Sequence, residues 1–377
     1  MKCCIFPNDP ILAYYNKGEL KERYFNPKNF FDEIHIISLI DKDIEETKVQ
    51  VLAGDAKLKI YSVGKINLKN RKKHVERIVE LVKKINPDVI RTFNPFVEGW
   101  LAAKCSKQLN IPMYLSLHTQ YDENRKLAKK NLKKYLALKY TEKTIEPEVI
   151  KQAKKITVVY KIIEPYVKRF VNESPEILHN KIDFNRFTDA KPVYVSEKPL
   201  IISVGALIPV KNHECIIETM KLVDAELLII GDGILHDELT DKVKKWNLTD
   251  KVKIIRSVPH EKIQGYYSSA SVFALAYNPR VEGIPMPVME AMAAGLPVII
   301  PFSETEFSEE WENSGLFCKE ITPESFAEKI NSILNDNKMH ERLSIGSKKM
   351  AKQFDQKKIE QREFEIYMEL VNHSIKL

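Results

Sequence analysis

Residues 272–300 constrain the fold more than any other stretch, because they predict a strand, a loop, a short helix and a second strand in close succession. Val272-Phe273-Ala274-Leu275-Ala276 is a short apolar run, typical of a buried strand. The helix is expected to begin near Pro287, since proline suits the first helical turn. It is expected to end at Gly295, because glycine commonly follows the last helical residue. Leu296–Ile300 then begins another strand.

Two carboxylates flank the expected start of this helix, Glu282 in the loop and Glu290 in the first helical turn. The start of a helix offers unpaired N–H groups and the positive end of a dipole, which suits a phosphate. A carboxylate beside that phosphate accepts hydrogen bonds from hydroxyl groups. The pair therefore fits a ligand with a polyol on each side of a phosphate, such as a nucleotide sugar. Either glutamate alone is more simply a helix-terminal charge or a solvated loop residue.

The flanking residues strengthen this interpretation. Glu282-Gly283 and Glu290-Ala291-Met292-Ala293-Ala294-Gly295-Leu296-Pro297-Val298 resemble the E-x7-E motif of retaining glycosyltransferases of family 4. The resemblance implies the α/β GT-B fold, in which two Rossmann-like, doubly wound parallel-sheet domains face each other across the cleft that holds the active site. It also implies that Glu290 binds the donor ribose and that Glu282 orients the donor hexose. The backbone around Gly283, Ile284 and Met286 is expected to bind the donor diphosphate.

The length of the chain supports two domains, since 377 residues exceed the size at which single cores stop growing. Strand and helix signals alternate through the first half, which predicts a parallel, doubly wound sheet. The predicted strands are Cys3–Phe6, Ile34–Leu39, Leu58–Val63, Asp88–Arg91, Met113–Leu117, Ile156–Val159 and Ile177–Leu178. We expect an acceptor-side domain over 1–185 and a nucleotide-sugar-binding domain over 196–354. The terminal helix, 355–377, is expected to cross back onto the first domain.

In the first domain the candidate residue is His118, which directly follows the predicted strand Met113–Leu117. A lone histidine is more often a packing or surface residue. The family resemblance favours a catalytic role, because members often carry a histidine here that contacts the donor hexose. The first loop departs from the family, since Pro7-Asn8-Asp9-Pro10 replaces its glycine-rich turn.

In the second domain, Gly205-Ala206-Leu207-Ile208-Pro209-Val210-Lys211 resembles the family's G-R-L-x-x-x-K loop. Lys211 matches the lysine that contacts the donor diphosphate, where a cation stabilises the charge that develops on the leaving group. Gly205 begins this loop and is expected to lie beside the donor. The family's arginine is replaced by Ala206, and Arg256 and Arg280 are candidates to supply its charge.

Two further segments match donor-binding positions of the family. Gly231 and Gly233 form a glycine turn after the apolar run Leu227–Ile230. Ser257 lies where members hold the nucleobase, largely through their backbone.

Together these residues predict a retaining glycosyltransferase that moves a hexose from a UDP-, GDP- or ADP-sugar to a glycan or lipid-linked acceptor. The family mechanism implies front-face substitution, in which the leaving phosphate assists deprotonation of the acceptor, with no obligatory cofactor and no metal. Two alternatives remain open. One is a nucleotide-sugar epimerase or hydrolase, and the other is a non-catalytic nucleotide-sugar-binding protein on the same fold.

The segment 124–143 is predicted to be one long basic helix, and it carries an apolar side. A basic amphipathic helix can lie on an anionic membrane, which would suit a lipid-linked acceptor. A solvated helix in a lysine-rich protein is the alternative. No recognition motif supports a nucleic-acid partner.

The five cysteines form no C-x-x-C pair, which favours reduced thiols. No apolar run approaches the length needed to span a bilayer. We therefore expect a cytoplasmic protein, either free or held peripherally at the inner face of the membrane.

Overall fold

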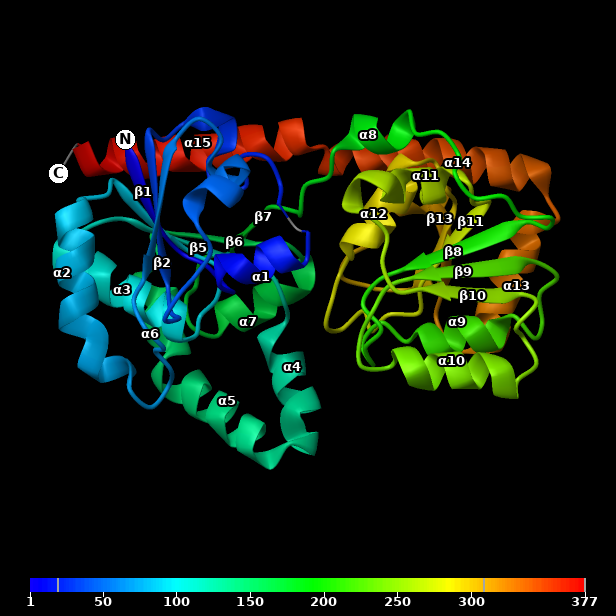
Figure 1. The fold of residues 1–377 in the computed structure, drawn as a ribbon, viewed down its shortest axis with the longest axis horizontal. Coiled ribbons are helices and arrows are strands. Elements are labelled where there is room, and N and C mark those ends of the chain that lie inside the picture. Colours follow the sequence, from blue (N-terminus) through cyan, green and yellow to red (C-terminus); the bar gives the residue numbers. More distant parts are fainter. Residues whose placement is uncertain (19, 308, 376–377) are drawn as a thin grey trace. The chain divides into compact units, whose positions relative to one another are not determined.

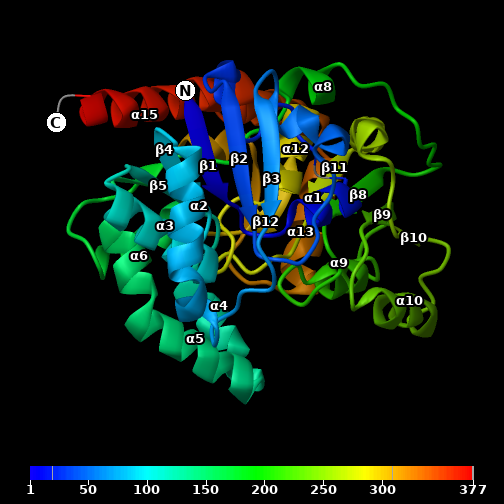
Figure 2. The same cartoon turned by 60° about the vertical axis from the view of Figure 1, so that its left-hand side comes forward.

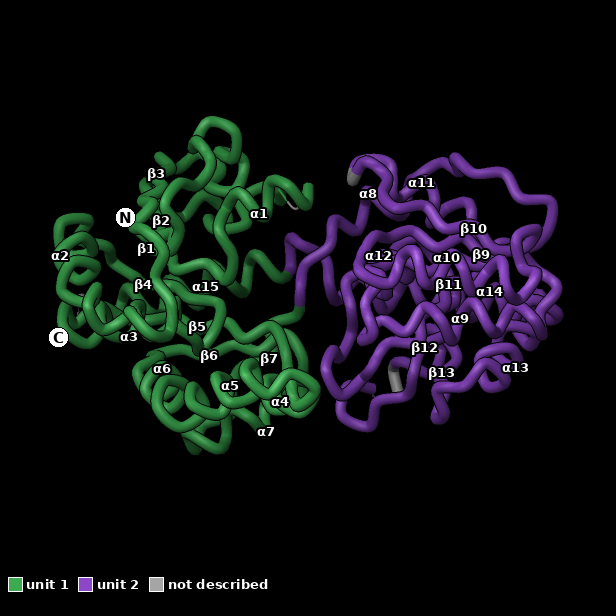
Figure 3. Tube along the Cα trace, turned by 60° about the horizontal axis from the view of Figure 1, so that its bottom comes forward, with its two compact units in different colours: residues 1–179, 359–377 green, residues 180–358 purple. Residues whose placement is uncertain are grey.

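The computed structural model describes residues 1–18, 20–307 and 309–375, which form two compact units (Figures 1 and 3). Unit 1 comprises Met1–His179 and Ile359–Leu377, and unit 2 comprises Asn180–Lys358. The boundary expected at residue 185 thus falls inside unit 2. The reason is that the short helix α8 (Phe184–Thr188) packs there, with the Thr188 hydroxyl donating to the Ala293 carbonyl at 3.2 Å.

Unit 1 contains a seven-stranded sheet in the order β3-β2-β1-β4-β5-β6-β7, and all of its strand pairs are parallel. Figure 2 shows β1, β2 and β3 side by side. The strands are β1 (Lys2–Phe6), β2 (Glu33–Ser38), β3 (Lys57–Ser62), β4 (Val89–Thr92), β5 (Met113–Leu117), β6 (Lys155–Val158) and β7 (Glu176–Ile177). Each predicted strand is confirmed to within one residue at either end. Strand order reverses between β1 and β4.

Helices cover both faces of this sheet, with α15 on the face opposite α2 and α3 (Figure 1). The helices of unit 1 are α1 (Ile11–Asn16), α2 (Val75–Ile85), α3 (Val97–Leu109), α4 (Tyr121–Leu127), α5 (Leu132–Thr144), α6 (Glu146–Gln152), α7 (Glu164–Lys168) and α15 (Gln356–Ile375). In α2, Ile78, Val79 and Val82 recur at helical spacing and are buried, so this face packs inward.

The prediction of one long helix over 124–143 is wrong. Helix α4 ends at Leu127, and a short 3-10 turn, Ala128–Lys130, separates it from α5. Asn131 is the N-cap of α5, where its side chain accepts a hydrogen bond from the Lys134 amide at 3.1 Å. Asparagine side chains compete for backbone groups and so favour helix starts over helix interiors.

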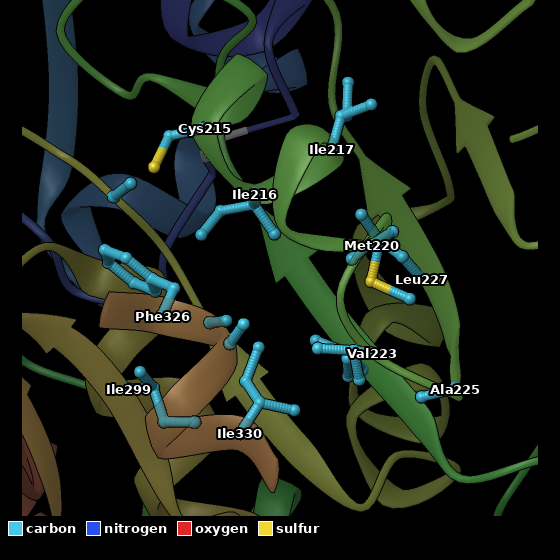
Figure 4. Packing of buried hydrophobic residues seen from close by; sticks show 14 of the residues in the cluster. Cys215, Ile216, Ile217, Met220, Val223, Ala225, Leu227, Ile299, Phe326 and Ile330 are labelled. Atoms are coloured by element: carbon cyan, nitrogen blue, oxygen red, sulfur yellow. The ribbon is translucent and has the colours of Figure 1, made fainter. Parts of the chain in front are cut away.

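Unit 2 contains a six-stranded parallel sheet in the order β10-β9-β8-β11-β12-β13. Its strands are β8 (Leu200–Val204), β9 (Glu226–Ile230), β10 (Val252–Ile255), β11 (Val272–Ala274), β12 (Val298–Pro301) and β13 (Gly315–Cys318). Besides α8, its helices are α9 (His213–Thr219), α10 (His236–Lys245), α11 (Ile263–Ser268), α12 (Met286–Ala293), α13 (Pro323–Leu334) and α14 (Asn337–Ala351). Apolar side chains of the sheet, α9 and α13 pack together, among them Ile216, Phe326 and Ile330 (Figure 4).

A buried ion pair fastens α15 to the sheet of unit 1. On β4, Arg91 Nη1 lies 2.5 Å from Glu363 Oε1 and donates a hydrogen bond to the Tyr367 hydroxyl at 2.8 Å. The rings of Phe93 and Tyr114 flank the guanidinium, with its central carbon 4.5 and 4.8 Å from their centroids. Burial by itself would lower the pKa of Arg91, but Glu363 and the neighbouring tyrosines together outweigh this effect, and the pKa is raised. Both charges therefore persist in the core.

Breaking this pair should destabilise unit 1. Glu363→Leu leaves a buried, unpaired guanidinium, so we expect a loss of about 3–5 kcal/mol in the free energy of unfolding. The double variant Arg91→Met/Glu363→Leu should recover most of that loss, because it buries no charge. Urea unfolding followed by circular dichroism measures both effects. Glu365→Leu, in the half-exposed part of the same helix, is the matched control. A Glu363→Leu variant as stable as this control would contradict the prediction.

Candidate functional site

The site of unit 2 lies where its strand order reverses, between β8 and β11. In open parallel sheets, ligands bind at the carboxyl ends of the strands that flank such a reversal. Residues 205–212 follow β8, and residues 275–285 follow β11. The Asn278 amide donates to the Val210 carbonyl at 2.8 Å, which joins the two loops.

Helix α12 begins at Met286, within one residue of the predicted start, with Pro285 as its N-cap. Gly295 follows its end with a φ of +85°, a conformation that favours glycine. A Cβ atom at Gly295 would also lie 2.4 Å from the Lys348 side chain. The Val288 amide donates to the Pro285 carbonyl at 3.0 Å. The expected phosphate-binding amides are therefore those that precede Val288.

The prediction that Glu290 lies in the first helical turn is wrong, because α12 begins at Met286 and Glu290 is its fifth residue. Glu290 is 9% exposed. The Tyr267 hydroxyl, from α11, donates to Glu290 Oε2 at 3.0 Å. Burial, together with the charge of Glu290, holds the pKa of Tyr267 well above its usual value, so this hydroxyl keeps its proton. Tyr267 orients the carboxylate and was not identified from the sequence, because no pattern around it signals a contact with α12. The ribose role of Glu290 stays a prediction.

Glu282 and Lys211 form an ion pair, with Lys211 Nζ 2.5 Å from Glu282 Oε2. Lys211 is 8% exposed, whereas a quarter of the Glu282 side chain is accessible (26%). Because the pair is largely buried, each charge compensates the other. The structure thus brings together the two residues expected to contact the donor diphosphate and hexose. A lysine has three donors, so Lys211 can bind a phosphate while it holds Glu282.

The glycines of this site are explained by close backbone contact between neighbouring loops. The Gly205 amide donates to the Ile230 carbonyl at 3.1 Å, and the Leu207 amide donates to the Asp232 carbonyl at 2.9 Å. A Cβ atom at Gly231 would lie 1.9 Å from the Gly205 carbonyl oxygen, and one at Gly233 would lie 2.5 Å from that of Leu207. Their expected contacts with the donor stay predictions.

The remaining candidates differ in their surroundings. Arg256 is paired with Asp232 at 2.8 Å and with Asp237 at 2.9 Å, so its charge is already compensated. Arg280 is exposed. Ser257 is exposed and follows β10, which β9 separates from β8.

His118 belongs to unit 1 and follows β5, with its ring 5.8 Å from that of Phe93. Burial lowers its pKa to about 4, and the charge of Arg91 acts in the same direction. Its Nε2 atom is buried and has no hydrogen-bond partner among the described residues. A neutral imidazole with an unused nitrogen at a strand's carboxyl end can bind a ligand hydroxyl, and its role on the donor hexose stays a prediction.

These features are typical of α/β proteins with a ligand site at the reversal point of a parallel sheet. Comparison with known proteins narrows this class. Residues 185–350 match the family model described as "Glycosyl transferases group 1". With the motif and fold above, this match shows that residues 185–350 are similar to the group 1 glycosyltransferases.

Individual relatives agree. The chain is 30% identical to the amylovoran biosynthesis glycosyltransferase AmsD of Erwinia amylovora, over 46% of this chain and 48% of the relative. It is 24% identical to an uncharacterized glycosyltransferase of Haemophilus influenzae, over 81% of this chain and 84% of the relative. Among solved structures, Anabaena Alr3699/HepE in complex with UDP and glucose has the same fold. Its TM-score is 0.74 at 14% identity, covering 98% of this chain and 100% of that one.

The lowered pKa of His118 predicts how stability depends on pH. An unfolded histidine titrates near ~6.5, and His118 titrates at about 4 in the fold. Between these values the unfolded chain binds the extra proton, so the free energy of unfolding falls as pH drops from about 6.5 towards 4. We expect the melting temperature of His118→Gln to fall less than that of wild type between pH 7 and pH 5. Parallel curves of melting temperature against pH would contradict this prediction.

Proposed function

We propose that the chain is a retaining glycosyltransferase that moves a hexose from a nucleotide-diphosphate sugar to a glycan or lipid-linked acceptor. The observation that carries the proposal is the juxtaposition of Lys211, Glu282 and the start of α12 at the reversal point of unit 2. A cation for the diphosphate and carboxylates for hydroxyl groups are the chemistry that such a donor needs. Alr3699/HepE, which shares the fold, binds UDP and glucose, which supports a nucleotide-sugar donor.

Each residue has one role in this proposal. Lys211 binds the diphosphate, Glu290 holds the ribose hydroxyl groups and Glu282 orients the hexose. His118 of unit 1 contacts the hexose as a neutral imidazole. Gly205, Gly231 and Gly233 let the backbone approach the donor, and Ser257 lies beside its base.

Negative charge develops on the diphosphate as the glycosidic bond breaks, and Lys211 stabilises that charge. The acceptor hydroxyl attacks from the face that the diphosphate leaves. Attack on this face retains the anomeric configuration, and a leaving phosphate oxygen takes the proton of the attacking hydroxyl. No metal takes part in this step.

Donor binding is the first test. A thermal-shift screen of UDP-, GDP- and ADP-sugars should raise the melting temperature with one base, because a ligand that binds only the folded state stabilises it. Lys211→Ala should reduce that shift. Product analysis with and without candidate acceptors then separates transfer from hydrolysis and epimerisation. Absence of any shift, or donor breakdown that no acceptor redirects, would overturn the proposal.

Glu282 and Glu290 should separate chemistry from nucleotide binding. Glu282→Ala removes the contact to the hexose, so we expect transfer to fall at least a hundredfold while nucleotide affinity is kept. Glu290→Ala removes the ribose contact, so nucleotide affinity should fall about tenfold. Calorimetric titration with the nucleoside diphosphate, beside an initial-rate assay, measures both effects. Unchanged transfer by Glu282→Ala, or an unaltered dissociation constant for Glu290→Ala, would contradict the corresponding role.

The surface of α4 and α5 supports contact with an anionic membrane. Leu127, Leu132 and Leu136 are 45, 67 and 57% exposed. The same segment carries exposed lysines that form no ion pair within the described residues, namely Lys129, Lys130, Lys133, Lys134 and Lys143. Exposed leucines beside uncompensated lysines fit the boundary of an anionic bilayer. None of the described helices combines the length and apolarity needed to cross a membrane.

We expect wild type to sediment with vesicles that contain phosphatidylglycerol, and Leu132→Ser/Leu136→Ser to bind them about tenfold more weakly, because two inserting side chains are lost. The control is Leu222→Ser/Ile345→Ser, which replaces two exposed apolar residues of unit 2. Equal binding by all three proteins, or none by wild type, would favour a solvated helix instead.

A further inference from the structure

His213 is a buried polar residue beside Lys211 that the proposed mechanism does not use. It is the first residue of α9 and is 2% exposed. Its Nδ1 atom lies 3.2 Å from the Ser203 hydroxyl of β8. Its Nε2 atom is buried and has no hydrogen-bond partner among the described residues. Buried polar atoms are nearly always paired, so an unpaired nitrogen here calls for an explanation.

The surroundings of Nε2 show which space it borders. A Cβ atom built on Gly205 would lie 3.6 Å from His213 Nε2 and 3.6 Å from Lys211 Cδ. The imidazole and the lysine side chain therefore border the same small volume, which the absence of a side chain at Gly205 leaves open. This volume adjoins the loop expected to hold the donor diphosphate.

The protonation state of His213 decides what it can offer a ligand. Burial and the charge of Lys211 together lower the pKa of His213 to about 4, and the Gly205 backbone acts against this shift. The ring is therefore neutral at pH 7. When the Ser203 hydroxyl donates to Nδ1, the single ring proton lies on Nε2. A neutral imidazole in this tautomer presents an N–H donor towards the space beside Gly205.

We propose that His213 donates its Nε2–H to the diphosphate of the bound nucleotide sugar, beside Lys211. This inference rests on the proposed function and adds a residue to its donor site. It also addresses Ala206, which stands where an arginine is expected. The loop contributes one cation, Lys211, and His213 supplies a second, uncharged donor to the same group. A fixed donor at the leaving diphosphate stabilises the charge that forms there without reorganisation.

Two amide substitutions test the assignment, because each places a polar group near a different nitrogen of the imidazole ring. His213→Gln places its amide near the position of Nε2, whereas His213→Asn places it near Nδ1. We expect His213→Asn to bind the nucleoside diphosphate about tenfold more weakly, and His213→Gln to stay within threefold of wild type. Affinity for the corresponding nucleoside should be the same in all three proteins. The probes are UDP, GDP and ADP with uridine, guanosine and adenosine, measured by calorimetry and by competition.

Several outcomes would overturn the inference. Equal losses of affinity for the nucleoside and the nucleoside diphosphate would assign His213 a purely structural role. Full affinity of His213→Asn for the nucleoside diphosphate would show that His213 does not contact it. Wild type itself provides a measurement that does not depend on how the variants fold. The ¹⁵N resonance of His213 Nε2 should shift with the diphosphate and stay unchanged with the nucleoside, and an unshifted resonance would contradict the contact. Failure of wild type to bind any nucleoside diphosphate would instead defeat the proposed function.

Discussion

The Lys211–Glu282 ion pair is the interaction on which the candidate donor site depends. It connects the loop after β8 to the loop after β11, at the point where strand order in unit 2 reverses. Both side chains are largely removed from water, so each needs the other to offset the cost of its burial. The pair thereby places a cation and a carboxylate next to the start of α12. A nucleotide-sugar donor carries a diphosphate between two polyols. The cation can bind the diphosphate, and the carboxylate can accept hydrogen bonds from polyol hydroxyl groups.

Other buried polar side chains of unit 2 are also oriented by close polar contacts. Tyr267 holds one oxygen of Glu290, and Ser203 lies beside one nitrogen of His213. These contacts fix side-chain orientation before any ligand arrives, which reduces the entropy lost on binding. The loops themselves are held by backbone hydrogen bonds that require glycine at the points of closest approach. A rigid site of this kind suits a reaction in which charge develops on a leaving group.

Unit 1 also contains a buried ion pair, but this pair joins a strand to a helix and lies outside the candidate donor site. The buried Arg91–Glu363 pair joins β4 to α15. Most of α15 thereby packs on the sheet of unit 1. Arg91 also contributes to the lowered pKa of His118, at the carboxyl end of the adjacent strand. On the same unit, α5 leaves leucines and lysines exposed instead of burying them. Unit 1 therefore combines a packed core with an exposed surface of leucines and lysines.

The sequence by itself determined the features that depend on neighbouring residues. Apolar runs predicted the strands of unit 1 to within a residue, and Pro287 and Gly295 predicted the bounds of α12, because proline and glycine act on their own backbone. The spacing of Glu282 and Glu290 predicts a nucleotide-sugar ligand, and this assignment stays a prediction.

The tertiary structure decided the features that join distant segments. The Lys211–Glu282 pair, the Tyr267–Glu290 hydrogen bond and the unpaired nitrogen of His213 follow from how strands are ordered in the sheet, which no local pattern encodes. The break before α5 was missed because helix-forming residues lie on both sides of Asn131. The side chain of Asn131 nevertheless caps the start of α5. The unit boundary was displaced because α8 finds its packing partners in the second unit. Local sequence preferences determine where the helices and strands form. Burial and contacts between segments that are distant in the sequence determine the candidate site.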